Sequence, residues 1–186
     1  FLRQLNENTY MLFYCYSEVT DSTIEARLGD IDYSYYFVLK AYISLLEKIG
    51  SVQITDRLDK AFAEECQKSV DSGGQCYLFA FAPPPKIPYA LPCPVVPVFA
   101  WEYSSIPNED SITDRRNSWS YALNQFGQAL THSSYAKQIV NAHMQETDKN
   151  FAIESIPAPL WDSCEALRRR ASTRGALRDG SITFRT

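Results

Sequence analysis

The sequence predicts an α/β fold, with a parallel sheet and helices on both of its faces. Three observations support this prediction. Apolar runs of strand length alternate with segments of helical periodicity, and glycines or prolines stand at several of the junctions. Two of the runs, Tyr10–Tyr16 and Gln75–Ala82, have the apolar character of strands buried on both faces. Such alternation calls for parallel strands joined by right-handed crossovers. With 186 residues, the chain is long enough for one domain with a buried core.

The first half of the chain contains three predicted strands and two predicted helices. In order, they are a strand at Tyr10–Tyr16, a helix at Phe37–Ile49, a strand at Ser51–Thr55, a helix at Leu58–Val70 and a strand at Gln75–Ala82. Gly50 ends the first helix, and Gly73 with Gly74 ends the second. The prolines that begin at Pro83 end the third strand, because proline cannot continue a hydrogen-bonded ladder.

The second half continues the alternation up to a change of character near Pro159. Its predicted elements are a strand at Pro94–Trp101, a helix at Ser118–Gly127, a strand at Gln128–Thr131, a helix from Ser133 or Ser134 to Met144, and a strand at Asn150–Ile156. An arginine-rich helix follows from Leu160. We therefore expect a Rossmann-like domain over residues 1–159, and a helical linker or the start of a further domain over residues 160–186. The start at Phe1 and the strand-like end at Thr186 favour a fragment of a longer protein.

Composition argues against several classes of function. The net charge of −4 and the pI near 5.2 give no general positive field, so nucleic acid is not an expected partner. The five cysteines are scattered without a CxxC pair and the chain has only two histidines, which predicts no metal site and favours reduced thiols in a cytoplasmic protein. No cofactor is expected. No run approaches the ~20 apolar residues of a membrane span.

Ligands of parallel α/β sheets bind at the carboxyl ends of the strands. The segments expected at that edge are Ser17–Ser34, Pro83–Pro92, Trp101–Asp114, Thr131–Ser134 and Pro157–Asp162. Gly29 lies in the first of them, before a helix that opens near Tyr33 and Ser34, so backbone N–H groups and the helix N-terminus could hold a phosphate. A loop glycine in a left-handed turn is the alternative.

The segment from Phe99 to Glu109 carries the most chemical information. Trp101 and Glu102 place an aromatic ring beside a carboxylate, a combination that suits a sugar, because C–H faces stack on rings and hydroxyls donate to carboxylates. Asn108 and Glu109 follow in the same loop and are expected to line the acceptor side. The alternative is a core tryptophan followed by a solvated glutamate.

Two further positions carry weaker signals. Ser133 and its neighbour His132 lie where a strand gives way to a helix, so Ser133 is either a helix cap or a hydroxyl that faces the cleft, and His132 is structural, solvated or catalytic. No GxSxG motif surrounds Ser133, which argues against a hydrolase triad. His143 is expected on the surface. The arginines from Arg168 to Arg178 form either a solvated helix face or a contact for phosphate or an acidic partner.

Several segments, in this order, resemble the N-terminal domains of GT-B glycosyltransferases of the large, retaining group 1. They are the single-glycine loop, LLEKIG with SVQI, the proline-bearing strand end, VFAWEYSSIPNE, RRNSW, ALTHSSYAKQIV and FAIESIPAP. The resemblance implies a domain that mainly holds the acceptor, which is a glycan, a lipid-linked molecule or a small molecule. A C-terminal half would hold most of the nucleotide-sugar donor. No second Rossmann-like unit follows Pro159, so the chain alone is expected to be inactive.

The resemblance also implies roles for individual residues. Gly29 matches a loop that approaches the donor phosphates, although the family commonly has two adjacent glycines there. Glu102, with Trp101, matches the strand end beside the reacting sugar, where related enzymes often have a histidine, and is the candidate catalytic residue. Ser133 matches the serine of the strand-to-helix turn.

Two other functions stay open at this point. One is a non-catalytic, Rossmann-like module that binds a sugar or nucleotide or docks a partner protein. The other is a dinucleotide-dependent oxidoreductase, which the missing GxGxxG motif disfavours.

Overall fold

A computed structural model describes residues 11–30, 32–107, 114–144 and 151–159, together with residues 164, 165 and 169. The elements in chain order are β1 (Met11–Tyr16), α1 (Tyr33–Leu46), β2 (Ser51–Thr55), α2 (Lys60–Asp71), β3 (Gln75–Phe81), the short 3-10 helix η2 (Pro84–Lys86), β4 (Val95–Phe99), a second short 3-10 helix η4 (Arg115–Asn117), α3 (Trp119–Phe126), β5 (Gln128–Thr131), α4 (Ser134–Met144) and β6 (Ala152–Ser155). Strands and helices alternate as predicted, which confirms the α/β class.

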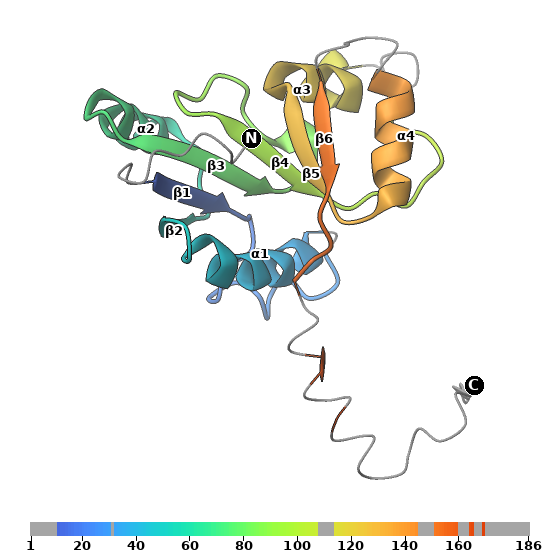
Figure 1. The fold of residues 1–186 in the computed structure, drawn as a ribbon, viewed down its shortest axis with the longest axis horizontal. Coiled ribbons are helices and arrows are strands. Elements are labelled where there is room, and N and C mark those ends of the chain that lie inside the picture. Colours follow the sequence, from blue (N-terminus) through green and yellow to red (C-terminus); the bar gives the residue numbers. More distant parts are fainter. Residues whose placement is uncertain are drawn as a thin grey trace.

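The six strands form one all-parallel sheet in the order β2-β1-β3-β4-β5-β6 (Figure 1). The chain starts near one edge, steps outward to β2, and then returns past β1 to add the remaining strands one after another on the other side. This topology is Rossmann-like and confirms the predicted parallel sheet. It leaves a switch point between β1 and β3, where the connections that follow these two neighbouring strands diverge.

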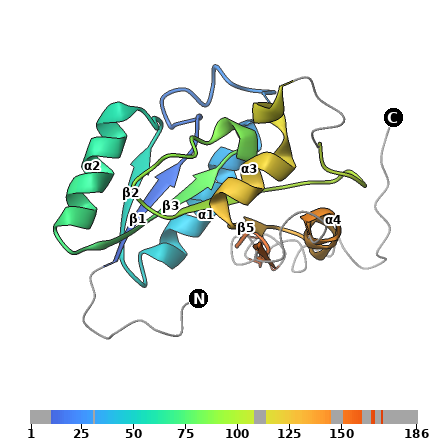
Figure 2. The same cartoon turned by 90° about the horizontal axis from the view of Figure 1, so that it is seen from above.

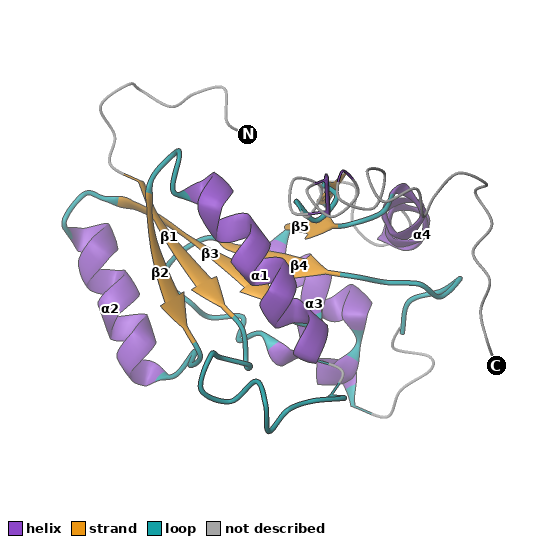
Figure 3. Cartoon of the chain, turned by 90° about the horizontal axis from the view of Figure 1, so that it is seen from below, coloured by secondary structure: helices purple, strands orange, loops and turns teal. Residues whose placement is uncertain are grey.

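Helices cover both faces of the sheet. Figure 3 shows α1 across one face, and Figure 2, from the opposite side, shows α2 and α3 on the other. Alternate residues of β1 explain how both faces are filled: Phe13 and Cys15 belong to the apolar cluster that includes α1, whereas Tyr14 and Tyr16 belong to the cluster that includes α2. The central strands β1, β3 and β4 are therefore apolar on both sides, whereas the edge strands β2 and β6 are more exposed.

Packing, and not the spacing of apolar residues, decides the buried face of α1. Tyr35, Leu39, Tyr42 and Leu46 point into the core. In contrast, Phe37 is 45% exposed, and Leu45 and Ile49 are also exposed. Apolar side chains surround this helix, so periodicity located the helix but did not identify its buried face.

Glycines shape two of the junctions. Gly50 precedes β2 at a point where an added Cβ atom would meet the carbonyl oxygen of Met11, so the close approach of the two backbones requires glycine. Gly127 ends α3 with a φ of 67°, in the left-handed region that favours glycine. The expected domain boundary at Pro159 adjoins residues that lie outside the described part of the chain.

Candidate functional site

The carboxyl ends of the strands meet along one edge of the sheet, because all strands run in the same direction. Phe81 pairs with Val98 and Phe99 pairs with Thr131, so β3, β4 and β5 end at nearly the same level. The loops that follow β1, β3, β4, β5 and β6 therefore lie on one rim, as the parallel topology predicted. Two features stand out among the described residues of this rim: a charged cluster at the switch point and an aromatic pocket beside it.

The charged cluster joins the loop after β1 to the loop after β3. Lys86 Nζ lies 2.5 Å from Asp32 Oδ2 and 3.5 Å from Glu18 Oε2, and Arg27 Nη2 lies 3.3 Å from the same Glu18 oxygen. Asp32 is only 7% exposed. Burial lowers the pKa of Lys86, but the hydrogen bond and the charge of Asp32 outweigh this effect and leave the pKa raised.

Asp32 also stands at the N-terminus of α1, where the helix dipole favours a negative charge. Its Oδ2 atom contacts Lys86, whereas its buried Oδ1 atom has no hydrogen-bond partner among the described residues. A buried, half-satisfied carboxylate is a group that a ligand hydroxyl or amide could complete. The negative charges of Asp32 and the neighbouring Glu18 would instead repel an incoming phosphate.

The sequence predicted both of these loops at the rim but not the charged cluster that joins them. The available signal was a carboxylate immediately before a helix, Asp32, together with a single lysine in a proline-rich loop, Lys86. Neither residue attracts attention alone, and 54 positions separate them in the chain.

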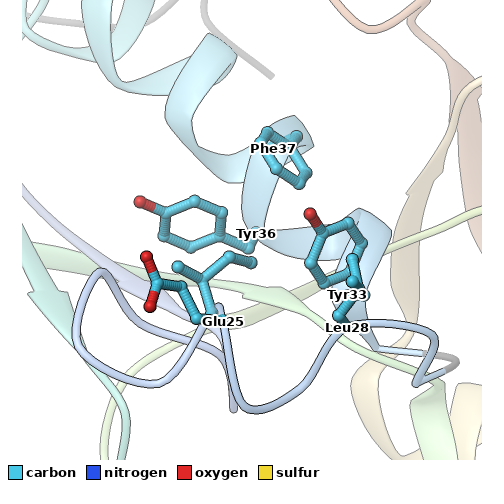
Figure 4. Close-up of a pocket in the computed structure, with 6 residues that line it drawn as sticks. Glu25, Leu28, Tyr33, Tyr36 and Phe37 are labelled. Atoms are coloured by element: carbon cyan, nitrogen blue, oxygen red, sulfur yellow. The ribbon is translucent and has the colours of Figure 1, made fainter.

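The aromatic pocket is an open, shallow depression of about 510 Å³ between the loop after β1 and the first turns of α1 (Figure 4). The side chains that line it are Ile24, Glu25, Leu28, Tyr33, Tyr36 and Phe37. Tyr33 is one of the predicted substrate-binding residues. The remaining five were not predicted, although the spacing of Tyr33, Tyr36 and Phe37 places three aromatic rings along one side of a helix.

The other predicted residues of the first loop have simple surroundings. Gly29 is exposed, has a φ of 91°, and has no atom within 4 Å of an added Cβ. Its conformation matches the left-handed loop glycine that was the alternative interpretation. Ser34 is exposed in the first turn of α1. A phosphate-binding role for either residue stays a prediction.

Trp101 is half-buried and integrated into its own loop. Its ring centroid lies 4.4 Å from that of Trp119 and 5.0 Å from that of Tyr103, and its indole N–H donates to the Ser105 carbonyl oxygen at 3.0 Å. Glu102 is exposed at the end of β4. The tryptophan thus contributes to packing, whereas the glutamate faces solvent.

Glu102 lies close to the N-terminal part of α1. Burial is the main reason that the pKa of Tyr35 is raised, a hydrogen bond to the Ala100 backbone acts against it, and the charges of Asp32 and then Glu102 add to the rise. The loop after β4 therefore borders the helix that begins at the aromatic pocket.

Ser133 and His132 lie at the end of β5. Ser133 Oγ accepts a hydrogen bond from the Ala136 N–H at 3.1 Å, so the exposed Ser133 caps α4. His132 Nδ1 lies 3.2 Å from the Ile156 carbonyl oxygen, which makes Nδ1 the donor and leaves a buried Nε2 without a partner among the described residues. Burial lowers the pKa of His132, and the Ile156 carbonyl partly opposes this effect.

Several predicted residues lie away from the candidate site or outside the described part of the chain. Asn108 and Glu109 are not described, nor are most of the C-terminal arginines. Arg169 pairs with Glu165 at 2.7 Å. His143, expected on the surface, is partly exposed, and its Nε2 lies 2.8 Å from Ser120 Oγ of α3.

No protein-family model, curated protein or solved structure matches the chain. Within the described ranges, no three His, Cys, Asp or Glu side chains gather in a way that could hold a metal ion. None of the helices in these ranges is long and apolar enough to cross a membrane. Functional inference therefore rests on the fold and on the chemistry of the rim.

Proposed function

We propose that the chain is the acceptor-side domain of a GT-B glycosyltransferase, which moves a sugar from a nucleotide-sugar donor to an acceptor once it is joined to a donor-binding half. The observation that carries this proposal is a Rossmann-like parallel sheet whose carboxyl edge presents aromatic rings and carboxylates together. This combination suits polyhydroxylated ligands, since rings cover C–H faces and carboxylates accept from hydroxyls. The ordered segments that resemble these enzymes give additional support.

Glu102 is the proposed catalytic residue. It is exposed at the end of β4, where its carboxylate can accept a hydrogen bond, and then a proton, from the attacking acceptor hydroxyl. Trp101 would support the loop that carries Glu102. Ser133, at the neighbouring strand end, would offer a hydroxyl to the substrate in addition to its role as a cap.

The charges on the rim agree with a donor that binds mainly to another domain. Lys86 and Arg27 lie at the switch point, but both pair with carboxylates. They are poorly available to a diphosphate, whose charge the carboxylates Glu18 and Asp32 would repel. We therefore propose that the nucleotide diphosphate is held by the donor-binding half.

A binding module without catalysis is the second candidate. The observation that favours it is that the aromatic pocket is lined entirely by described residues of this chain, so binding there needs no second domain. Calorimetric titration of the chain with nucleotide sugars and simple glycans separates the two candidates. A module that acts alone binds a nucleotide sugar or a glycan with measurable heat, whereas an isolated acceptor half binds a glycan only weakly and nucleotide sugars weakly or not at all.

The decisive experiment expresses the protein from its complete gene and measures transfer from a panel of nucleotide sugars. We expect Glu102→Gln to reduce kcat by about 100-fold, because the hydroxyl of the acceptor loses its proton acceptor. Glu64→Gln, a change at an exposed carboxylate of α2, serves as the matched control and should leave kcat unchanged. Wild-type activity in both Glu102→Gln and Trp101→Ala, with the fold intact, would show that the site is assigned wrongly. Absence of transfer from every donor would reject the proposed function.

A further inference from the structure

We propose that the aromatic pocket binds an uncharged sugar ring of the acceptor, so that the acceptor is recognised as a glycan and not through a phosphate. This inference rests on the proposed function and deepens it. The pocket consists of the six side chains named above, from the loop after β1 and from α1 (Figure 4). Its position on the carboxyl rim, beside the switch point, is where ligands of such sheets bind.

The aromatic rings are held in place before any ligand arrives. The ring of Phe37 packs edge to face against Tyr33, with centroids 5.2 Å apart, and against Tyr36, with centroids 5.3 Å apart. The Tyr36 hydroxyl donates to Asp21, which also accepts from Lys40 Nζ at 2.9 Å. A ring surface fixed in this way loses little conformational entropy when a sugar stacks on it.

The pocket leaves apolar surface exposed to water. Leu28 is 73% exposed, and Phe37 is 45% exposed although it belongs to the first turns of a helix whose other side fills the core. Covering such surface with the C–H face of a ring is favourable. Glu25 lines the same pocket and offers a carboxylate to a hydroxyl at the edge of that ring.

The surrounding charges exclude two other occupants. Glu25 lines the pocket without an ion-pair partner among the described residues, so its charge would repel a phosphate or the phosphorylated end of a lipid. Glu18, Asp21 and Asp30 of the same loop are paired with Arg27 or Lys40. A quaternary ammonium group would compete with Lys40, whose Nζ already lies 5.4 Å from the centroid of the Tyr36 ring. An uncharged ring that carries hydroxyls is compatible with both the rings and the charges.

Saturation-transfer NMR on the chain tests this inference with defined probes. The probes are the methyl glycosides of glucose, galactose, mannose and N-acetylglucosamine, with choline and hexanol as the cationic and apolar alternatives. We expect saturation of the ring C–H protons of at least one glycoside, and a loss of about tenfold in its affinity in Phe37→Ala and Glu25→Gln. Both side chains lie outside the core, so these variants should fold.

Tyr135→Ala is the matched control, because Tyr135 is a 44% exposed tyrosine in the first turn of α4 on the same rim. It should bind the glycoside as the wild type does. The proposal is overturned if no glycoside is saturated, if Phe37→Ala and Glu25→Gln bind it unchanged, or if choline or hexanol displaces it from the pocket.

A second measurement separates failure of this inference from failure of the proposed function. In the protein expressed from the complete gene, Phe37→Ala should raise KM for the acceptor about tenfold and leave hydrolysis of the donor unchanged. Glycoside binding without any transfer by the wild type would reject the glycosyltransferase and keep the sugar site. Transfer with an unchanged acceptor KM in Phe37→Ala would reject the sugar site alone.

Discussion

Asp32 illustrates how one residue can serve the fold and the candidate site together. It places a negative charge at the N-terminus of α1, and it forms the most buried contact of Lys86. The ion pair of Asp32 with Lys86 connects the loop after β1 to the loop after β3 at the switch point. The geometry of the rim therefore depends on an electrostatic contact as well as on the sheet.

We predict that Lys86→Met lowers the free energy of unfolding by about 1–2 kcal/mol, because it leaves Asp32 buried without its cation. The expected loss is smaller than that for a fully buried ion pair, since the Lys86 side chain is 43% exposed. Urea denaturation at neutral pH measures the change. Lys60→Met is the control, because the pair of Lys60 with Glu64 is exposed and 3.8 Å long. Equal effects in the two variants would contradict a stabilising role for the contact of Lys86 with Asp32.

This contribution has a defined dependence on pH. The pKa of Lys86 is raised above its ordinary value of 10.5 in the folded chain, so the folded state favours the charged form. The stabilisation is complete below about pH 10.5 and is lost as the pH rises through the pKa of the folded state. The Lys86→Met variant lacks this amino group, so its stability should not fall with pH through the titration of residue 86.

At the scale of single elements, α4 depends on its cap. Ser133→Ala should lower the free energy of unfolding by about 1 kcal/mol, because the N–H of Ala136 loses its acceptor. Ser133→Asp should retain wild-type stability, since a carboxylate caps the helix equally well and interacts favourably with its dipole. Thermal and urea denaturation measure both effects. If Ser133→Asp is destabilised as much as Ser133→Ala, capping of α4 is not the contribution of Ser133 to stability.

The same pair of variants separates the two roles that the sequence left open for Ser133. In the enzyme from the complete gene, a serine that acts only as a cap gives full transfer activity in Ser133→Asp. A serine whose hydroxyl also touches the substrate gives a stable but impaired Ser133→Asp variant.

Another element, α1, shows the limit of periodicity. The spacing of apolar residues predicted a helix, and the helix is present, but aromatic and aliphatic side chains occur on every side of it. Only packing against the sheet decided that Tyr42 lies inside and Phe37 outside. The exposed side became the aromatic pocket, which is why the sequence pattern did not reveal it.

At the scale of the whole molecule, buried tyrosines should make the fold sensitive to alkali. Burial raises the pKa of Tyr16 and of Tyr42 to about 12, from an ordinary value of 10.0. The folded state thus favours the neutral phenols, and their contribution is complete below about pH 10 and is lost as the pH rises toward 12. Each tyrosine should lower stability by up to about 1.4 kcal/mol per pH unit in this interval.

Tyr42→Phe tests this prediction. At neutral pH it should cost about 1 kcal/mol, because the hydroxyl donates to the Ile156 carbonyl oxygen at 3.1 Å. Between about pH 10 and pH 11.5 its stability should decline less steeply than that of the wild type. Urea denaturation across this interval, with tyrosinate absorbance as a second signal, gives both slopes. Tyr103→Phe, at a 60% exposed position, is the control, and equal slopes for Tyr42→Phe and the wild type would refute the assignment.

The sequence by itself determined the order of strands and helices, the parallel sheet and the loops that form the rim. These properties follow from local patterns: continuous apolar runs, helical spacing and the glycines or prolines at the junctions. The tertiary structure alone decided the contact of Lys86 with Asp32, the rotation of α1 that created the aromatic pocket, and the contact of His143 with Ser120. Each depends on which distant side chains the folded sheet brings within a few ångströms, and no local pattern encodes that distance.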